Sequence, residues 1–168
     1  MQVESELSAL TDIIFRIKPR FILEIGNYRG ETLKRLGEAS SSDAVIIGID
    51  ISEVPSFKTK DNQTLYLIQG DSQSLETFHK VQDLLQGNQL DFLFIDGDHF
   101  NVEKDFNLYA PLVKNDGLIG FHDIVHGAKE LVGTVPEFWP KVKENKRHME
   151  IVENWEQGGY GIGLIYKE

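Results

Sequence analysis

The sequence contains no cysteine. A chain without cysteine forms no disulfide bonds, holds no zinc through thiolates and offers no cysteine nucleophile. Any metal site in this protein is therefore expected to use carboxylate, imidazole and water ligands.

Long apolar runs are also missing. No segment approaches the roughly 20 apolar residues that span a bilayer. The N-terminus, MQVESELSAL, is acidic where a secretory signal has a basic start and an apolar centre. We therefore expect no membrane insertion, no export and a cytoplasmic location.

Basic residues are scarce relative to acidic ones: 17 Lys and Arg stand against 27 Asp and Glu, for a net charge of −10 at pH 7. Non-specific binding to nucleic acid depends on Lys and Arg displacing condensed counterions. The local basic run Lys141, Lys143, Lys146 and Arg147 is explained at least as well by a solvated helix face. We expect a small-molecule substrate and no nucleic-acid partner.

The length of 168 residues and the hydrophobic fraction of 40% fit one compact domain over 1–168. Within it, helical spacing predicts an amphipathic helix within 1–18 that covers a sheet and stops at Pro19; the apolar residues are Leu7, Leu10, Ile13, Ile14 and Ile17. Residues 21–168 form the predicted α/β core. The sequence leaves the oligomeric state open, and a homo-oligomer is compatible with it.

Short apolar segments alternate with helical patterns along most of the chain. Strands are predicted at 21–25, 44–49, 64–69, 90–95 and 118–121, and helices at 31–39, 74–85 and 102–109. The link 51–63 contains Pro55 and little periodicity, so it is expected to be irregular. The alternation predicts a doubly wound, Rossmann-like α/β fold with a mostly parallel sheet.

The last third departs from this alternation. A helix is predicted near 136–145, followed by strands at 149–152 and 161–166 around a turn-rich segment. Neighbouring strands joined by a short loop are antiparallel, so the last strand is expected to run against its neighbour.

A glycine-containing turn, EIGNYRG, follows the first predicted strand. In doubly wound sheets ligands bind at the carboxyl ends of the strands, and glycines allow a close approach to backbone N–H groups. Tyr28 and Glu31 break the G-x-G-x-x-G pattern of dinucleotide sites, and no P-loop pattern occurs. Taken alone, Gly26 and Gly30 fit an ordinary turn equally well. Asp50 ends the second strand, where a carboxylate can accept hydrogen bonds from ribose hydroxyls.

A second group of ionisable residues follows two later strands: Asp96, Asp98 and His99 after 90–95, and His122 and Asp123 after 118–121. Carboxylates mixed with imidazoles are ligands for divalent cations. The alternative is structural, with the aspartates capping the next helix and His122 packed under the sheet. Five such residues on two strand ends favour a metal or substrate role.

Other chemically capable side chains are given structural interpretations. His79 and His148 are expected to be structural or solvated, and His126 borders the predicted site without an assigned role. Trp139, Trp155 and Phe138 are expected to pack in the core rather than to line an acceptor pocket.

Five segments resemble class I S-adenosylmethionine-dependent methyltransferases: 23–33, 46–52, 68–75, 90–124 and 160–167. They look most like cephalosporin hydroxylase-like proteins and sugar or antibiotic O-methyltransferases. The similarity runs from about Phe21 to the C-terminus, and the IDGDH and FHDI blocks are its most specific parts. The resemblance implies a seven-stranded sheet whose last strand is antiparallel.

The resemblance also implies site residues and cofactors. S-adenosylmethionine would contact the glycine loop, the ribose position at the end of the second strand and the adenine end after the third. An Asp-Ser pair before a helix is also a routine N-cap. His122 stands where relatives often carry an acidic residue, which matters for the Mg²⁺ or Mn²⁺ ion that some of them use. The implied cofactor residues are Glu24, Gly26, Asn27, Tyr28, Gly30, Asp50, Ile51, Asp71, Ser72 and Asp96; the catalytic residues are Asp96, His99 and His122; the metal ligands are Asp96, His122 and Asp123.

The function expected from these features is methyl transfer from S-adenosylmethionine to a small molecule, at an oxygen atom. A hydroxyl acceptor needs activation, either by a metal ion or by His99 or His122 as a base. Two alternatives remain at this point: a catalytically silent S-adenosylmethionine-binding protein, and a metal-dependent hydrolase. The hydrolase leaves the glycine loop and Asp50 without a joint purpose.

Overall fold

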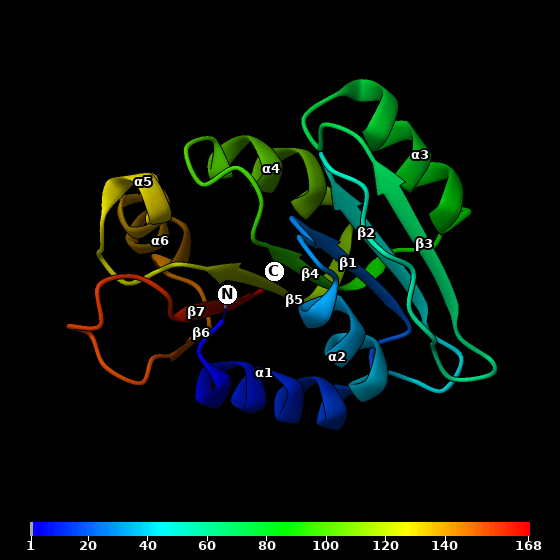
Figure 1. Ribbon diagram of the computed structural model, residues 1–168, viewed down its shortest axis with the longest axis horizontal. Coiled ribbons are helices and arrows are strands. Elements are labelled where there is room, and N and C mark those ends of the chain that lie inside the picture. Colours follow the sequence, from blue (N-terminus) through cyan, green and yellow to red (C-terminus); the bar gives the residue numbers. More distant parts are fainter. Residues whose placement is uncertain (1) are drawn as a thin grey trace.

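A computed structural model describes residues 2–168, and a seven-stranded sheet lies at its centre (Figure 1). The strand order is β3-β2-β1-β4-β5-β7-β6. Strands β1 to β5 are parallel, and β7 runs antiparallel to both β5 and β6. This confirms the predicted α/β class, the seven strands and the antiparallel last strand. The strands are β1 Phe21–Ile25, β2 Val45–Asp50, β3 Thr64–Gln69, β4 Leu90–Ile95, β5 Val113–His122, β6 His148–Ile151 and β7 Ile162–Tyr166.

Helices cover both faces of the sheet. In the view of Figure 1, α1 and α2 lie below it and α3 and α4 above it. Two buried apolar clusters follow from this layering: one joins α1 and α2 to one face, and the other joins α3, α4 and α6 to the opposite face. The helices are α1 Glu4–Ile17, α2 Glu31–Ala39, α3 Leu75–Leu85, α4 Val102–Tyr109, the 3₁₀ helix η1 Ala110–Leu112, α5 Lys129–Val132 and α6 Val135–Lys143.

The N-terminal helix covers the sheet as its pattern predicts. Leu7, Leu10 and Ile14 of α1 are buried against α2 and the sheet. The helix ends at Ile17: the C-cap residue Lys18 still donates its N–H to the Ile14 carbonyl, and its left-handed backbone turns the chain out of the helix. Among residues 2–168, no helix has the length and apolar character needed to cross a membrane.

The largest difference from the sequence-based boundaries is in β5, which begins at Val113 rather than at 118. Its first residues are polar and carry no strand pattern. They are held instead by neighbours: the Asp116 N–H donates to the Lys167 carbonyl, and the register against β4 shifts between Leu90 and Phe92. The short helix α5 was likewise not predicted.

One packing expectation is wrong, and one open alternative is decided. Trp155 is 55% exposed in the loop between β6 and β7, whereas Trp139 is buried at 2%. The N-cap of α3 is Ser74, which accepts from the Thr77 N–H, and neither Asp71 nor Ser72 caps that helix. The physical reason is that the Asp71 carboxylate already accepts the Gln73 N–H in a turn two residues earlier.

Candidate functional site

The glycine turn after β1 requires glycine at its first position. Gly26 has φ +86°, and a Cβ there would overlap the backbone of Asp96 and Gly97. The Gly26 N–H donates to the Ile49 carbonyl and the Asp96 N–H to the Ile25 carbonyl, each at 2.8 Å. The turn thus brings the carboxyl ends of β1, β2 and β4 into contact.

A cavity of about 470 Å³ opens at these strand ends. Asp50 holds its rim: its carboxylate accepts the N–H of Tyr28 at 2.7 Å and the N–H of Ser52 at 2.8 Å. These bonds fix the carboxylate at the end of β2, beside the exposed side chain of Ile51. Five of the predicted cofactor residues line this cavity: Gly26, Asp50, Ile51, Asp71 and Ser72.

A buried polar network lies beneath the far end of this cavity. The Ser72 hydroxyl donates to Asp105 of α4 at 2.7 Å, and the Tyr109 hydroxyl donates to the Ser72 carbonyl at 2.7 Å. The second oxygen of Asp105 has no partner among the described residues. Burial raises the pKa of the Asp105 carboxyl from 3.8 to about 6, against the opposing effect of the Ser72 hydrogen bond.

This carboxyl gives a pH-dependent prediction. Because its pKa is raised in the folded protein, stability is lost as pH rises from about 4 to about 6 and stays reduced above that range. Asp105→Asn keeps an acceptor for Ser72, so we expect it to raise the free energy of unfolding at pH 7 by about 1–2 kcal/mol. Urea unfolding at pH 7 and pH 4 measures this. If Asp105→Asn changed the free energy of unfolding equally at pH 7 and pH 4, ionisation of Asp105 would not be the cause of the pH dependence.

Glu24 and Asn27 of this turn do not line the first cavity. Asn27 donates to a Glu24 carboxyl oxygen at 2.6 Å, and both side chains are buried. Burial, reinforced by the charge of Asp96, raises the pKa of Glu24 well above its ordinary value. Asn27 and Tyr28 instead line a second cavity of about 550 Å³, which also reaches Asp96.

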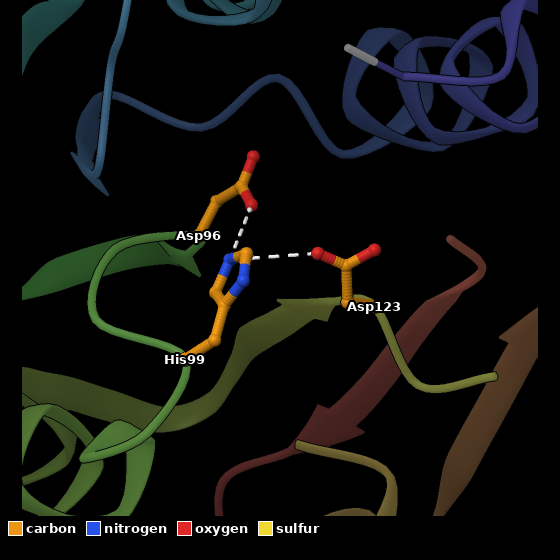
Figure 2. Close-up of side chains that lie close together, drawn as sticks. All are labelled: Asp96, His99 and Asp123. Atoms are coloured by element: carbon orange, nitrogen blue, oxygen red, sulfur yellow. Dashed lines mark hydrogen bonds and ion pairs between the residues drawn. The ribbon is translucent and has the colours of Figure 1, made fainter. Parts of the chain in front are cut away.

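Four side chains, Asp96, His99, His122 and Asp123, form a ring at the ends of β4 and β5, and Asp96 lines the second cavity. Figure 2 shows three of them, Asp96, His99 and Asp123. Asp96 Oδ1 is 3.3 Å from His99 Nε2 and 3.0 Å from His122 Nδ1. Asp123 Oδ2 is 3.5 Å and 3.2 Å from the same two nitrogens. These residues follow or end β4 and β5, so parallel pairing of the two strands brings them together.

The opposite charges of the aspartates and the histidines shift the pKa values of the groups in this ring. Burial disfavours an imidazolium, yet Asp96 and Asp123 outweigh it and raise the pKa of His122 to about 10. The same opposition raises the pKa of His99, again with Asp96 prevailing over burial. Burial would raise the pKa of Asp96, but His122 and His99 hold it well below its ordinary value. His122 is therefore a buried cation between two carboxylates.

The structure separates Asp98 from this ring. Its carboxylate accepts the N–H of Phe100 and the side-chain amide of Asn101, in the turn before α4. Asp98 thus holds the turn and lines the first cavity, but neither Asp98 nor Asp96 caps α4, whose N-cap is Asn101 without a side-chain cap. His79, His126 and His148 are all exposed.

One residue at this site escaped the sequence reasoning. The Gln2 amide donates to Asp96 Oδ2 at 2.8 Å, and its own oxygen has no partner among residues 2–168. No local pattern marks Gln2, because its position depends on how α1 is laid across the sheet.

Comparison with known proteins agrees with this arrangement. The family described as "Methyltransferase domain" matches residues 23–124, which is more than half of the sequence. The chain belongs to this methyltransferase family. The matched region contains the glycine turn, the cavity residues and the ring of aspartates and histidines.

Solved structures share the whole fold of this methyltransferase at low identity. An O-methyltransferase from Bacillus cereus, in complex with SAH, is 17% identical with a TM-score of 0.75, and the alignment covers 99% of this chain and 83% of that one. The O-methyltransferase TomG from Streptomyces achromogenes, in complex with SAM, is 14% identical with a TM-score of 0.71, covering 100% and 82%. No curated protein matches the sequence. Family and fold confirm the resemblance to class I methyltransferases.

Proposed function

We propose that this protein transfers a methyl group from S-adenosylmethionine to the hydroxyl oxygen of a small molecule, with a divalent ion at the ring of Asp96, His99, His122 and Asp123. The observation that carries the proposal is the cavity at the strand ends, which is lined by Gly26, Asp50 and Asp71; Gly26 also lines the second cavity, together with Asp96 of the ring. The bound SAH and SAM of the two structural relatives support the choice of cofactor.

The residues that line the cavity offer partners for the ribose and the adenine of S-adenosylmethionine. The Asp50 carboxylate has free lone pairs after accepting two backbone N–H groups, so it can accept from ribose hydroxyls. Asp71 and Ser72 lie at the adenine end, and Gly26 allows the cofactor to approach the backbone. Ile51 of the first cavity and Asn27 and Tyr28 of the second complete the proposed binding set, whereas Glu24 and Gly30 line neither cavity.

The spacing of the ring atoms fits a metal ion. An ion at 2.0–2.2 Å from each ligand sets neighbouring ligand atoms about 2.8–3.6 Å apart in tetrahedral or octahedral geometry. The nitrogen–oxygen distances of His99 to Asp96 and Asp123, 3.3 and 3.5 Å, lie in this range, and one ligand atom from each of these three residues lies within 4.8 Å of the others. His122 faces the same two carboxylates at 3.0 and 3.2 Å. A divalent ion would also supply positive charge to the two carboxylates, and its binding to the His122 nitrogen would release the proton that the imidazolium holds. Mixed nitrogen and oxygen ligands favour Mn²⁺ over Mg²⁺.

The reaction follows from alignment of three atoms. The acceptor oxygen forms a bond to the methyl carbon while the carbon–sulfur bond breaks, and the sulfur keeps the electron pair as S-adenosylhomocysteine leaves. Holding these atoms in line provides most of the acceleration. A bound ion would lower the pKa of the acceptor hydroxyl. With an ion held by the ring, the hydroxyl proton would pass to solvent. In a transfer without an ion, unprotonated His99 rather than His122 would accept it, because the side chain of His99 is 24% exposed and that of His122 only 4%.

Asp50→Ala provides the first test of the cofactor site. We expect the variant to stay folded and to bind S-adenosylhomocysteine more weakly by roughly 1–3 kcal/mol, the cost of losing charge-assisted hydrogen bonds. Isothermal titration calorimetry measures the dissociation constant.

The matched control is Asp43→Ala, which removes a surface carboxylate paired with Arg20 just before the opposite end of β2. It should leave the affinity unchanged. NAD should not bind, since Tyr28 stands where a dinucleotide requires glycine. Tight NAD binding without any response to S-adenosylhomocysteine would overturn the cofactor assignment. Cofactor binding without transfer to any hydroxyl acceptor would instead favour a silent binding protein.

A further inference from the structure

A buried carboxylate in the first turn of α1 holds a distant loop. Glu6 is 1% exposed, and it has no cationic partner among the described residues. It accepts three hydrogen bonds instead: from the Glu153 N–H at 3.0 Å, the Gln157 side-chain amide at 2.8 Å and the Gly161 N–H at 2.9 Å. All three donors belong to residues 152–161, the loop between β6 and β7.

A buried carboxylate is costly unless its lone pairs are satisfied. The positive end of the α1 dipole and three N–H donors offset that cost for Glu6. An apolar side chain would fill this position without such a requirement. The carboxylate therefore binds the loop at both ends, at Glu153 and Gly161, in addition to the bonds within the loop and those that Ile124 and Val125 donate to it.

The same loop reaches the ring through its last turn. Tyr160, next to Gly161, donates its N–H to Asp123 Oδ1 at 2.9 Å, while Asp123 Oδ2 faces the two imidazoles. Tyr160 and Asp123 both have left-handed backbones, with φ of +62° each. Such a conformation costs energy in residues other than glycine and persists only where the surroundings enforce it.

We propose that Glu6 is a positioning residue, which fixes the 152–161 loop so that the Tyr160 N–H orients the Asp123 carboxylate toward His99 and His122. The connection runs from the first turn of α1, through the Gly161 N–H and Tyr160, to one oxygen of Asp123. Its relevance to catalysis rests on the proposed function, but the contacts themselves involve no ligand.

The test is Glu6→Gln in the ligand-free full chain. The amide keeps the size of the side chain but turns an NH₂ group toward at least one of the three donors. We expect hydrogen exchange at the Tyr160 and Gly161 amides to accelerate about 10- to 100-fold. In long-range ¹H–¹⁵N spectra, which resolve the five imidazoles of the chain, the signals of His99 and His122 should shift and those of His79 and His148 should not.

Ser5→Ala is the matched control, because the Ser5 hydroxyl contacts the same loop through the exposed carboxylate of Glu153 but lies outside the connection to Asp123. It should change neither readout. If Glu6→Gln fails to fold, Gln157→Ala removes one of the three donors and should give the same pattern in weaker form.

Two results would overturn the proposal. Unchanged exchange at Tyr160 and Gly161 would mean that Glu6 does not hold the loop. Faster exchange without a shift of the His99 and His122 signals would mean that Glu6 stabilises the loop and does not act on the ring. Binding of S-adenosylhomocysteine to wild type is measured separately, and its failure would contradict the proposed function. Amide exchange and the imidazole signals would still decide the role of Glu6.

Discussion

Asp96→Asn is expected to lower Mn²⁺ affinity, measured in the presence of S-adenosylhomocysteine, by at least roughly 100-fold. The substitution removes a negative charge from the ring and places an NH₂ group near the nitrogens of His122 and His99, which lie 3.0 and 3.3 Å from Asp96 Oδ1. Methyl transfer to a hydroxyl acceptor should fall roughly 100- to 1000-fold, because the lost interaction stabilises charge in the transition state. S-adenosylhomocysteine affinity should change by less than about 10-fold, since most cofactor contacts lie elsewhere in the cavity.

Titration calorimetry with MnCl₂ and turnover assays with and without EDTA measure these effects. Asp83→Asn, which alters an exposed carboxylate on α3, is the control and should match wild type. A folded Asp96→Asn protein with full Mn²⁺ affinity and full turnover would contradict the assignment of the ring as the reaction site. Turnover that survives EDTA in wild type but is lost in the variant would show that the reaction needs no metal ion. Asp96 would then act as a partner of the imidazoles.

Gly26→Ala is expected to destabilise the protein by more than about 3 kcal/mol, through backbone strain at positive φ added to overlap with the strand beside it. The new methyl group would meet the backbone of Asp96 and Gly97, which cannot move without disturbing β4. S-adenosylhomocysteine binding should weaken at least roughly 10-fold, because the cofactor passes this turn.

Gly87→Ala separates the two contributions. Gly87 has nearly the same backbone, φ +82° against +86°, but nothing lies within 4 Å of the position of its Cβ. We therefore expect about 1 kcal/mol of strain there, with cofactor binding unchanged. Urea unfolding of both variants gives the comparison. Equal losses of stability would show that close approach of β1 and β4 does not require Gly26.

The sequence by itself determined the layered fold and the edge of the sheet at which the site lies. Buried parallel strands appear in the sequence as short apolar runs, and helices appear as periodic patterns. Because the two alternate, few chain topologies are possible. Residues that directly follow strands, such as Asp50 and Asp96, can be placed because all parallel strands end on one side. Local patterns were insufficient for the start of β5, whose polar residues are held by pairing with distant backbone.

Only the tertiary structure decided which side chains complete the site. That His99 and His122 both face Asp96 and Asp123, while Asp98 turns away, depends on side-chain directions set by packing. Gln2 reaches Asp96 across 94 residues, and Glu6 reaches Gly161 across 155. Contacts at such separations arise when α1 is laid over the sheet and the last hairpin closes beside β5, and no local sequence pattern encodes where two distant segments meet.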